Sequence, residues 1–182
     1  MKARSIVFWG TPPPPIGGMT VHIKRLSELL ESEKWDVSFF DFNGQFNDPR
    51  SIKVSNLIKW YLALWFSSSS RVHYVITTKP FVRFLASLLV LRGKTVILRV
   101  GGRSLEEGLK GKFLLKIYSK ISLKLCSSVI CVSEEIADLA KNHTSPKKVN
   151  IIPGFIFPNL EKEDLEIPKE INEYWEEANK KV

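Results

Sequence analysis

Short apolar runs alternate with amphipathic stretches along most of the 182 residues. Six runs are mainly apolar, as buried strands are, and they cover residues 5–9, 36–42, 72–77, 95–100, 128–132 and 149–152. Between them, apolar residues recur every three or four positions, which predicts helices near residues 19–30, 80–91, 109–126 and 133–141. Apolar strands that alternate with helices predict an α/β fold, in which a parallel sheet is flanked by helices on both faces.

The connection between the first strand and the first helix is unusual, because it holds four prolines at residues 12–15 and then Gly17 and Gly18. Proline fixes φ and stiffens the loop, whereas two glycines without Cβ atoms allow a ligand to approach the backbone. Since the N–H groups at a helix N-terminus attract anions, the segment is typical of an anion-binding loop. A flexible turn explains the two glycines equally well at this point.

Charge is distributed unevenly along the chain, whose formal net charge is +8. Eight acidic and four basic residues after Pro158 give −4, which leaves +12 on residues 1–158. We therefore expect one basic domain over residues 1–158 and an acidic linker with a helix over residues 159–182. A basic domain suits nucleic acid, anionic lipid or a phosphorylated substrate.

Several classes of protein are disfavoured by missing patterns. The loop after the first strand lacks the G-x-G-x-x-G of dinucleotide-binding folds, and the chain lacks the P-loop pattern of nucleotide hydrolases. Cys126 and Cys131 have neither metal-site spacing nor neighbouring histidines, so we expect two buried free thiols and no metal site. The first residues lack the apolar core of a signal peptide, and no apolar run reaches the roughly 20 residues of a membrane span.

Four segments, in order, resemble the opening domain of glycosyltransferase family 4 enzymes. They are residues 14–18 (Pro-Pro-Ile-Gly-Gly) with His22, residues 96–102 (Val-Ile-Leu-Arg-Val-Gly-Gly), residues 129–135 (Val-Ile-Cys-Val-Ser-Glu-Glu) and residues 149–154 (Val-Asn-Ile-Ile-Pro-Gly). The resemblance covers about residues 5–158. It departs from the family at Gly101, where many relatives carry a histidine, and at Gly154, where relatives have asparagine.

This resemblance implies one Rossmann-like half of a two-domain GT-B enzyme, the half that binds the acceptor. The expected activity is retaining, metal-independent transfer from a nucleotide-sugar, which is a co-substrate, with no cofactor. The donor-binding half is then missing and belongs to the same or a separate chain. The expected acceptor is a glycan or a lipid phosphate in polysaccharide synthesis, and the expected location is the cytoplasm or the inner face of the membrane. Nucleic-acid binding is not expected, since no recognised motif accompanies the charge.

The residues expected to bind substrate follow strand ends that the resemblance aligns with the cleft: Gly17, Gly18, Arg99, Gly101, Gly102, Arg103 and Ser104. Further candidates are His22, Lys79, Ser133 and Glu134. Each has a structural alternative. His22 fits a packing residue at a helix edge, Arg99 fits a buried ion pair as well as a phosphate site, and Ser133 fits an N-cap followed by a favourable first-turn charge at Glu134.

Two stretches bear on partners. Around the expected helix 109–126, Lys112, Lys116, Lys120 and Lys124 form a ladder beside an apolar stripe, and no acidic residue lies between Glu107 and Glu134. We expect this ladder to face an anionic membrane surface. Residues 57–66, rich in Trp and Tyr, fit buried core or an interfacial membrane patch.

Two alternatives to the acceptor-binding half of a single-chain enzyme stay open. One is a split transferase whose donor domain is another polypeptide. The other is a non-catalytic module that binds anionic lipid or glycan through its basic face.

Overall fold

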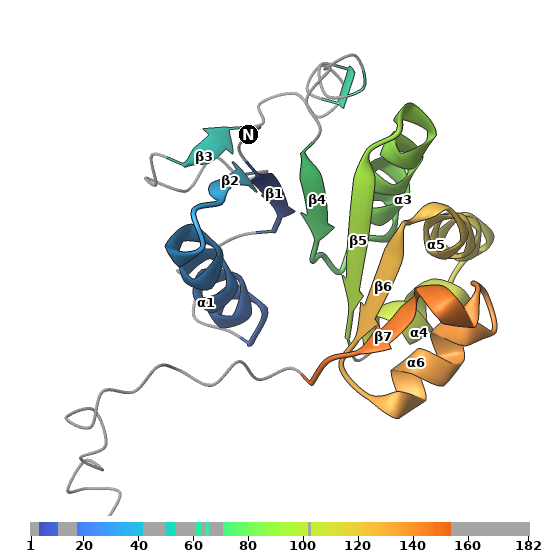
Figure 1. Ribbon diagram of the computed structural model, residues 1–182. Coiled ribbons are helices and arrows are strands. Elements are labelled where there is room, and N and C mark those ends of the chain that lie inside the picture. The colour runs from blue at the N-terminus through green and yellow to red at the C-terminus, as the bar shows by residue number, and fades with distance from the viewer. Residues whose placement is uncertain are drawn as a thin grey trace, which may run out of the picture.

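The computed structural model describes residues 4–10, 18–41, 50–53, 61, 62, 65, 71–101 and 103–153. Seven parallel strands form one sheet in the order β3-β2-β1-β4-β5-β6-β7 (Figure 1). They are β1 (Ser5–Trp9), β2 (Asp36–Asp41), β3 (Ser51–Lys53), β4 (Val72–Val75), β5 (Thr95–Val100), β6 (Ser128–Cys131) and β7 (Val149–Ile151). The predicted α/β, Rossmann-like arrangement is confirmed.

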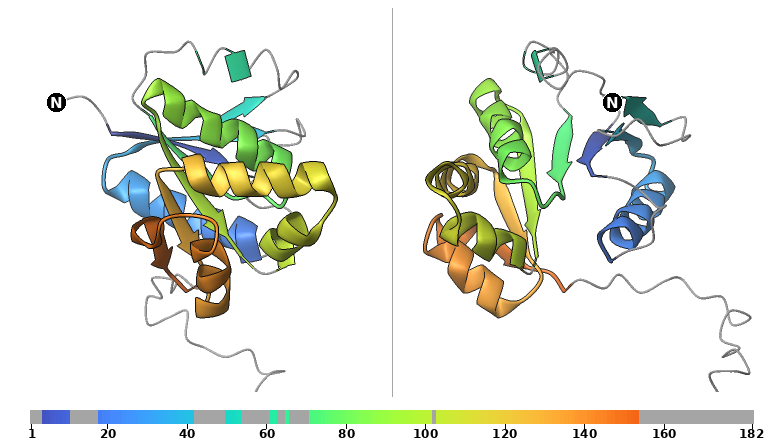
Figure 2. Two further views of the ribbon diagram at one scale, coloured as in Figure 1. Left: turned by 90° about the vertical axis from the view of Figure 1, so that its right-hand side faces the viewer. Right: turned by 180° about the vertical axis from the view of Figure 1, so that it is seen from behind.

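Helices of the described residues lie on both faces of this sheet. Helix α1 (Gly18–Ser32) covers one face over β1 and β2. The opposite face carries α3 (Pro80–Leu88), α4 (Arg103–Lys110), α5 (Phe113–Leu125) and α6 (Glu134–Lys141), as the view from behind in Figure 2 shows. Short 3₁₀ turns follow α3 at Leu89–Arg92 and precede β7 at Pro146–Lys148.

Alternation along the strands produces two cores, one on each face. On the α1 side, Phe8 stacks on Phe39 with ring centroids 5.5 Å apart, and Ile23 of α1 packs against them. On the opposite side, Val7 and Trp9 belong to the larger core, which α3 to α6 cover. Each strand is thus apolar on both faces, which is why the strands read as nearly continuous apolar runs.

The six predicted strands are all present, and each ends within two residues of its predicted end. The sequence analysis missed β3. This strand has three residues and no apolar run, and it is placed by pairing with Phe39, Phe40 and Asp41 of β2.

The prediction of one long helix over residues 109–126 was wrong. The chain forms α4 and α5 with a break at Gly111 and Lys112. A Cβ atom at Gly111 would lie 2.6 Å from the carbonyl oxygen of Glu107, so only glycine fits where the chain leaves α4. Lys112 therefore precedes α5, and only three lysines of the predicted ladder belong to one helix.

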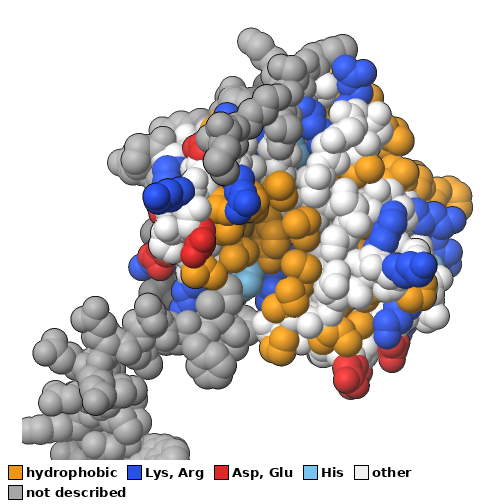
Figure 3. Space-filling view, viewed as in Figure 1, with side chains coloured by type: hydrophobic (Ala, Val, Ile, Leu, Met, Phe, Trp, Pro, Cys, Tyr) orange, Lys and Arg blue, Asp and Glu red, His pale blue; other side chains and the backbone are white. Residues whose placement is uncertain are grey.

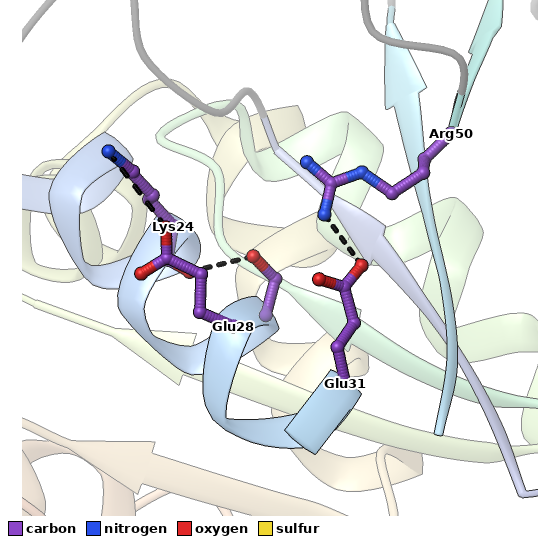
Figure 4. A network of polar contacts seen from close by, with 5 residues as sticks. Lys24, Glu28, Glu31 and Arg50 are labelled. Carbon is purple, nitrogen blue, oxygen red and sulfur yellow. Dashed lines mark hydrogen bonds and ion pairs between the residues drawn. The ribbon is translucent and has the colours of Figure 1, made fainter. Parts of the chain in front are cut away.

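Polar contacts on the surface tie α1 to the edge of the sheet. The Arg50 guanidinium, just before β3, lies 2.6 Å from a Glu31 carboxylate oxygen and 5.0 Å from the Phe39 ring centroid. On the same helix, Lys24 pairs with Glu28 one turn later at 3.9 Å (Figure 4). Exposed pairs of this kind contribute little stability each, so burial of the apolar side of α1 holds the helix in place.

Three further expectations concern burial. Cys126 and Cys131 are buried free thiols, as predicted. Tyr61 and Trp65 are half-buried against the larger core, which favours the core interpretation for these two aromatic residues. Residues 154–182, with the predicted acidic linker and helix, lie outside the described part of the chain. Within that part, no helix has both the length and the apolar character needed to cross a bilayer.

Candidate functional site

A cleft of about 430 Å³ opens at the carboxyl edge of the sheet. It lies beside the point where the strand order reverses, with β2 on one side of β1 and β4 on the other. Ligands of open α/β sheets bind at such points. The walls are formed by Gly18, Met19, Ile76, Thr77, Thr78, Arg99, Gly101, Ser104 and Val132. Figure 3 shows a hollow beside α1 that is lined by hydrophobic side chains.

Among the described residues that line the cleft, Arg99 is the only charged one. It is the next-to-last residue of β5, on the α1 side of the sheet, and is 7 % exposed. None of the ion pairs among the described residues involves Arg99. Its guanidinium donates a hydrogen bond to the Tyr74 hydroxyl and, with its charge, partly opposes the rise that burial causes in the pKa of Tyr74.

His22 completes this polar group from α1. Its Nε2 lies 3.0 Å from the Tyr74 hydroxyl oxygen. Because Arg99 can only donate, the Tyr74 proton is free to point at Nε2, which leaves the imidazole proton on Nδ1. Burial first, and the Arg99 charge second, lower the pKa of His22 to about 4, so the ring is neutral near pH 7. Nδ1 is buried and has no hydrogen-bond partner among the described residues.

A second buried guanidinium braces the cleft from behind. Arg83 of α3 is 1 % exposed, and its Nη2 donates to the carbonyl oxygens of Thr78 and Ser104 at 3.1 Å each. Both acceptors belong to residues that line the cleft, Thr78 between β4 and α3 and Ser104 in the first turn of α4. Its Nε has no partner within the described structure, and burial lowers the pKa of the side chain to about 10. Arg83 therefore fixes the distance between two walls of the cleft and adds positive charge behind them.

Helix ends add to this field. Gly18 and Met19 form the start of α1, and Ser104 lies at the start of α4. The first N–H groups of a helix are unpaired within the helix and carry partial positive charge. Since no acidic residue is among the described residues that line the cleft, the site is electropositive. Its chemistry suits the phosphate group of a ligand.

The structure brings four of the predicted binding residues together around this cleft: Gly18, Arg99, Gly101 and Ser104. Gly17, Gly102 and the side chain of Arg103 lie outside the described structure. Of the further candidates, His22 lies behind Arg99 as a buried packing residue.

Three of the further candidates lie away from the cleft walls. Lys79 is exposed and occupies the position before α3. Ser133 is the N-cap of α6, where its Oγ accepts from the Ile136 N–H at 3.5 Å. Glu134 lies in the first turn of the same helix, exposed. The structural alternatives given for Ser133 and Glu134 therefore fit their positions.

Gly10, just after β1, and Gly18, at the start of α1, differ in their surroundings. Gly18 does not have a positive φ, and a Cβ atom built on it would meet nothing within 4 Å. Gly10 is the glycine that packing requires, because a Cβ atom there would lie 2.7 Å from Ile76 Cγ2 and 2.8 Å from Ile23 Cδ1. The open space beside Gly18 is part of the cleft.

Sequence reasoning missed Tyr74 and Arg83. Tyr74 lies within an apolar strand, so its role as partner of Arg99 depends on pairing between β4 and β5. Arg83 could have been noticed, because it interrupts the apolar face of the helix that begins at Pro80.

No protein-family model matches the chain, and a search of curated proteins likewise found no match. Across the described residues, no three His, Cys, Asp or Glu side chains lie close enough together to hold a metal ion.

Proposed function

We propose that this chain is the acceptor-binding domain of a retaining, metal-independent glycosyltransferase that uses a nucleotide-sugar donor. The donor-binding half is a further domain of the same polypeptide or a separate chain. The acceptor is a phosphate-bearing glycan or lipid in polysaccharide synthesis, handled in the cytoplasm or at the inner face of the membrane. One support is that the four segments that resemble the family occur in the family's order. A second is that three of these segments contribute residues to the cleft walls, which are Gly18, then Arg99 with Gly101, and Val132.

The observation that carries the proposal is the buried Arg99 guanidinium in the cleft wall. It lacks a carboxylate partner among the described residues, so its charge is available to a ligand. A guanidinium with a fixed partner on one side, here Tyr74, is well suited to a bidentate contact with phosphate on the other. A phosphate held there would place the attached acceptor across the mouth of the cleft, where a donor domain can reach it.

A non-catalytic or split-enzyme binding module is the second candidate, because an electropositive cleft suits it as well. The two differ in what the chain achieves with a donor-binding half. The transferase proposal requires sugar transfer once that half is present, whereas a module that only binds requires none.

A binding test addresses the cleft. Pyrophosphate is titrated calorimetrically into the 182-residue chain, its Arg99→Met variant and the control Arg71→Gln. Arg71 precedes β4 at the opposite edge of the sheet, so the control removes the same charge far from the cleft. We expect Arg99→Met to weaken binding at least about tenfold, the loss of one charge-assisted contact, and Arg71→Gln to leave it unchanged. Equal weakening by both variants would reduce the effect to net charge.

A transfer test addresses the reaction. The coding sequence after the Val182 codon and the neighbouring genes are read for a Rossmann-like domain with a Glu-x7-Glu motif. The chain is then assayed alone and together with that domain, with a radiolabelled nucleotide-sugar and a lipid-linked acceptor. We expect no sugar transfer by the chain alone. We expect sugar transfer by the chain together with that domain, and we expect Arg99→Met to abolish it. Transfer by the isolated chain, or none by the pair, contradicts the proposal.

A further inference from the structure

Helix α5 turns a polar, small-residue side toward the protein. Its fully buried residues are Ser119, Ser122 and Leu123. On one flank Tyr118 packs against Phe81 and Phe84 of α3, with ring centroids 5.5 and 5.0 Å apart. Figure 2 shows α5 between α3 and α6 with its outer side uncovered.

The apolar residues of α5 therefore lie mostly on the wrong side for core packing. Ile117 and Ile121 are each two residues from Ser119, about 200° around the helix, so they point away from the buried side. They are half-buried. At the start of the helix, Phe113 is 75 % exposed and Leu114 59 % exposed. Of the predicted apolar stripe, Leu109 lies in α4 and is buried in the core, whereas Phe113, Ile117 and Ile121 of α5 face outward.

Lysines border this stripe along the flank that faces α6. Lys116, Lys120 and Lys124 follow one another at single turns, and Lys112 precedes the helix. None of the four is in an ion pair of the described residues. Burial first, and then the charges of Lys120, Lys116 and Lys124, lower the pKa of His143, which lies in the connection between α6 and β7, so the three lysines extend their positive charge to that connection. Figure 3 shows lysine and arginine side chains gathered beside hydrophobic ones at that edge of the molecule.

We propose that the outer side of α5 is a docking surface for a bilayer that carries anionic phospholipids. The surface comprises Phe113, Leu114, Ile117 and Ile121 together with Lys112, Lys116, Lys120 and Lys124. A helix that lies in the headgroup region typically carries an apolar stripe edged by lysines. Its rings and branched chains point toward the acyl boundary, and its ammonium groups lie at the phosphates.

Its shape and charge favour a bilayer over other occupants. Phe113 and Leu114 form a protruding tip rather than a groove, which suits insertion between lipids. Nucleic acid would use the lysines but leave the apolar tip without a partner. A second copy of this surface would bring the two lysine rows together without an acidic residue between them.

Position links the surface to the cleft. Strands β5 and β6 are parallel, so the connection between them must return from the carboxyl edge to the amino edge. Helix α5, about 20 Å long, makes that return. Its tip at Phe113 therefore lies toward the sheet edge that holds the cleft, and docking would bring the cleft close to the lipid surface. The inference itself does not depend on the sugar-transfer reaction.

The experiment is co-sedimentation of the 182-residue chain with phosphatidylcholine vesicles, with and without phosphatidylglycerol. Two double variants test the surface. Phe113→Ser/Leu114→Ser removes the tip, and Lys116→Gln/Lys120→Gln removes two charges. We expect the chain to bind only anionic vesicles. Phe113→Ser/Leu114→Ser should weaken this binding at least about tenfold, and Lys116→Gln/Lys120→Gln should weaken it about 30-fold. Binding should also fade as salt rises well above about 0.1 M.

Matched controls separate the surface from general effects. Leu91→Ser removes an apolar side chain that is 63 % exposed in the 3₁₀ turn after α3, and Lys24→Gln/Lys34→Gln removes two exposed lysines on the α1 side. Both should bind as the wild type does, and all variants should keep their pyrophosphate affinity. Equal binding to neutral and anionic vesicles would overturn the proposal, and so would unchanged binding by either test variant. The proposal would also be overturned if the chain bound no vesicles but self-associated, and Phe113→Ser/Leu114→Ser abolished that self-association.

Discussion

Acidification should destabilise the protein through His73, which lies buried in the middle of β4. The side chain is 1 % exposed, and its Nδ1 accepts a hydrogen bond from Trp9 Nε1 at 3.1 Å. Nδ1 must be unprotonated to accept, so protonation breaks this bond between β4 and β1. Burial above all, and then the charges of Lys94 and Arg71, lower the pKa of His73 from 6.5 to about 4.

The sign and size of the effect follow from linkage. The unfolded chain takes up this proton below pH 6.5, whereas the folded protein takes it up only near pH 4. The free energy of unfolding is therefore unaffected by His73 above pH 6.5 and falls as the pH drops through the window from 6.5 to 4. At about pH 5 the loss is about 2 kcal/mol, a large part of the roughly 5–15 kcal/mol of a typical domain.

Urea unfolding, followed by far-UV circular dichroism at about pH 7.5 and about pH 5, measures this loss in the wild type and in His73→Asn. Asparagine offers an acceptor oxygen close to the position of Nδ1 but does not titrate. The free energy of unfolding of His73→Asn should be lower than that of the wild type at both pH values, because asparagine is smaller than histidine. On acidification, it should fall by about 2 kcal/mol less than that of the wild type. His143→Gln is the control, since this half-buried histidine should leave most of the loss in place. A loss in His73→Asn as large as in the wild type would refute the reasoning.

Three further predictions concern the loop after β1, the start of α1 and the cap of α6. Gly10→Ala should cost about 1–3 kcal/mol and lower the melting temperature, because its Cβ would press on Ile76 and Ile23. Gly18→Val should leave the melting temperature nearly unchanged but weaken pyrophosphate binding, since its side chain would fill open cleft space; unchanged binding would reduce Gly18 to a turn residue. Ser133→Ala should lower the free energy of unfolding by about 0.5–1 kcal/mol, near the low end for an N-cap because the capping contact is 3.5 Å long. A urea titration that shows no change would contradict that role.

The strand pattern was predictable because both faces of the sheet are buried. In β1, Val7 and Phe8 face opposite cores, so the run is apolar throughout and stands out from the surrounding sequence. The break between α4 and α5 was not predictable from periodicity, since Leu109 and Phe113 keep helical spacing across it. It depends on the close approach of Gly111 to the Glu107 carbonyl.

The cleft was predictable in part, for the same reason that the sheet was. Residues that end parallel strands must share one edge, and this rule found Arg99, Gly101 and Ser104. It could not find Tyr74, which reaches Arg99 from the adjacent strand β4, or Arg83, which approaches from α3. Such contacts depend on strand register and helix packing rather than on any local pattern.

The positive charge of the cleft has a cost that bears on its purpose. Arg83 and Arg99 are both more than nine-tenths buried, and neither is in an ion pair of the described residues. Taking a cation out of water is unfavourable unless hydrogen bonds and an opposite charge compensate. Arg83 has two carbonyl partners, whereas its Nε has none among the described residues, so these residues compensate its charge only in part. An anion in the cleft would supply the missing charge. Part of its binding free energy would then come from compensating charge that folding has already buried, on walls that Arg83 holds in place beforehand.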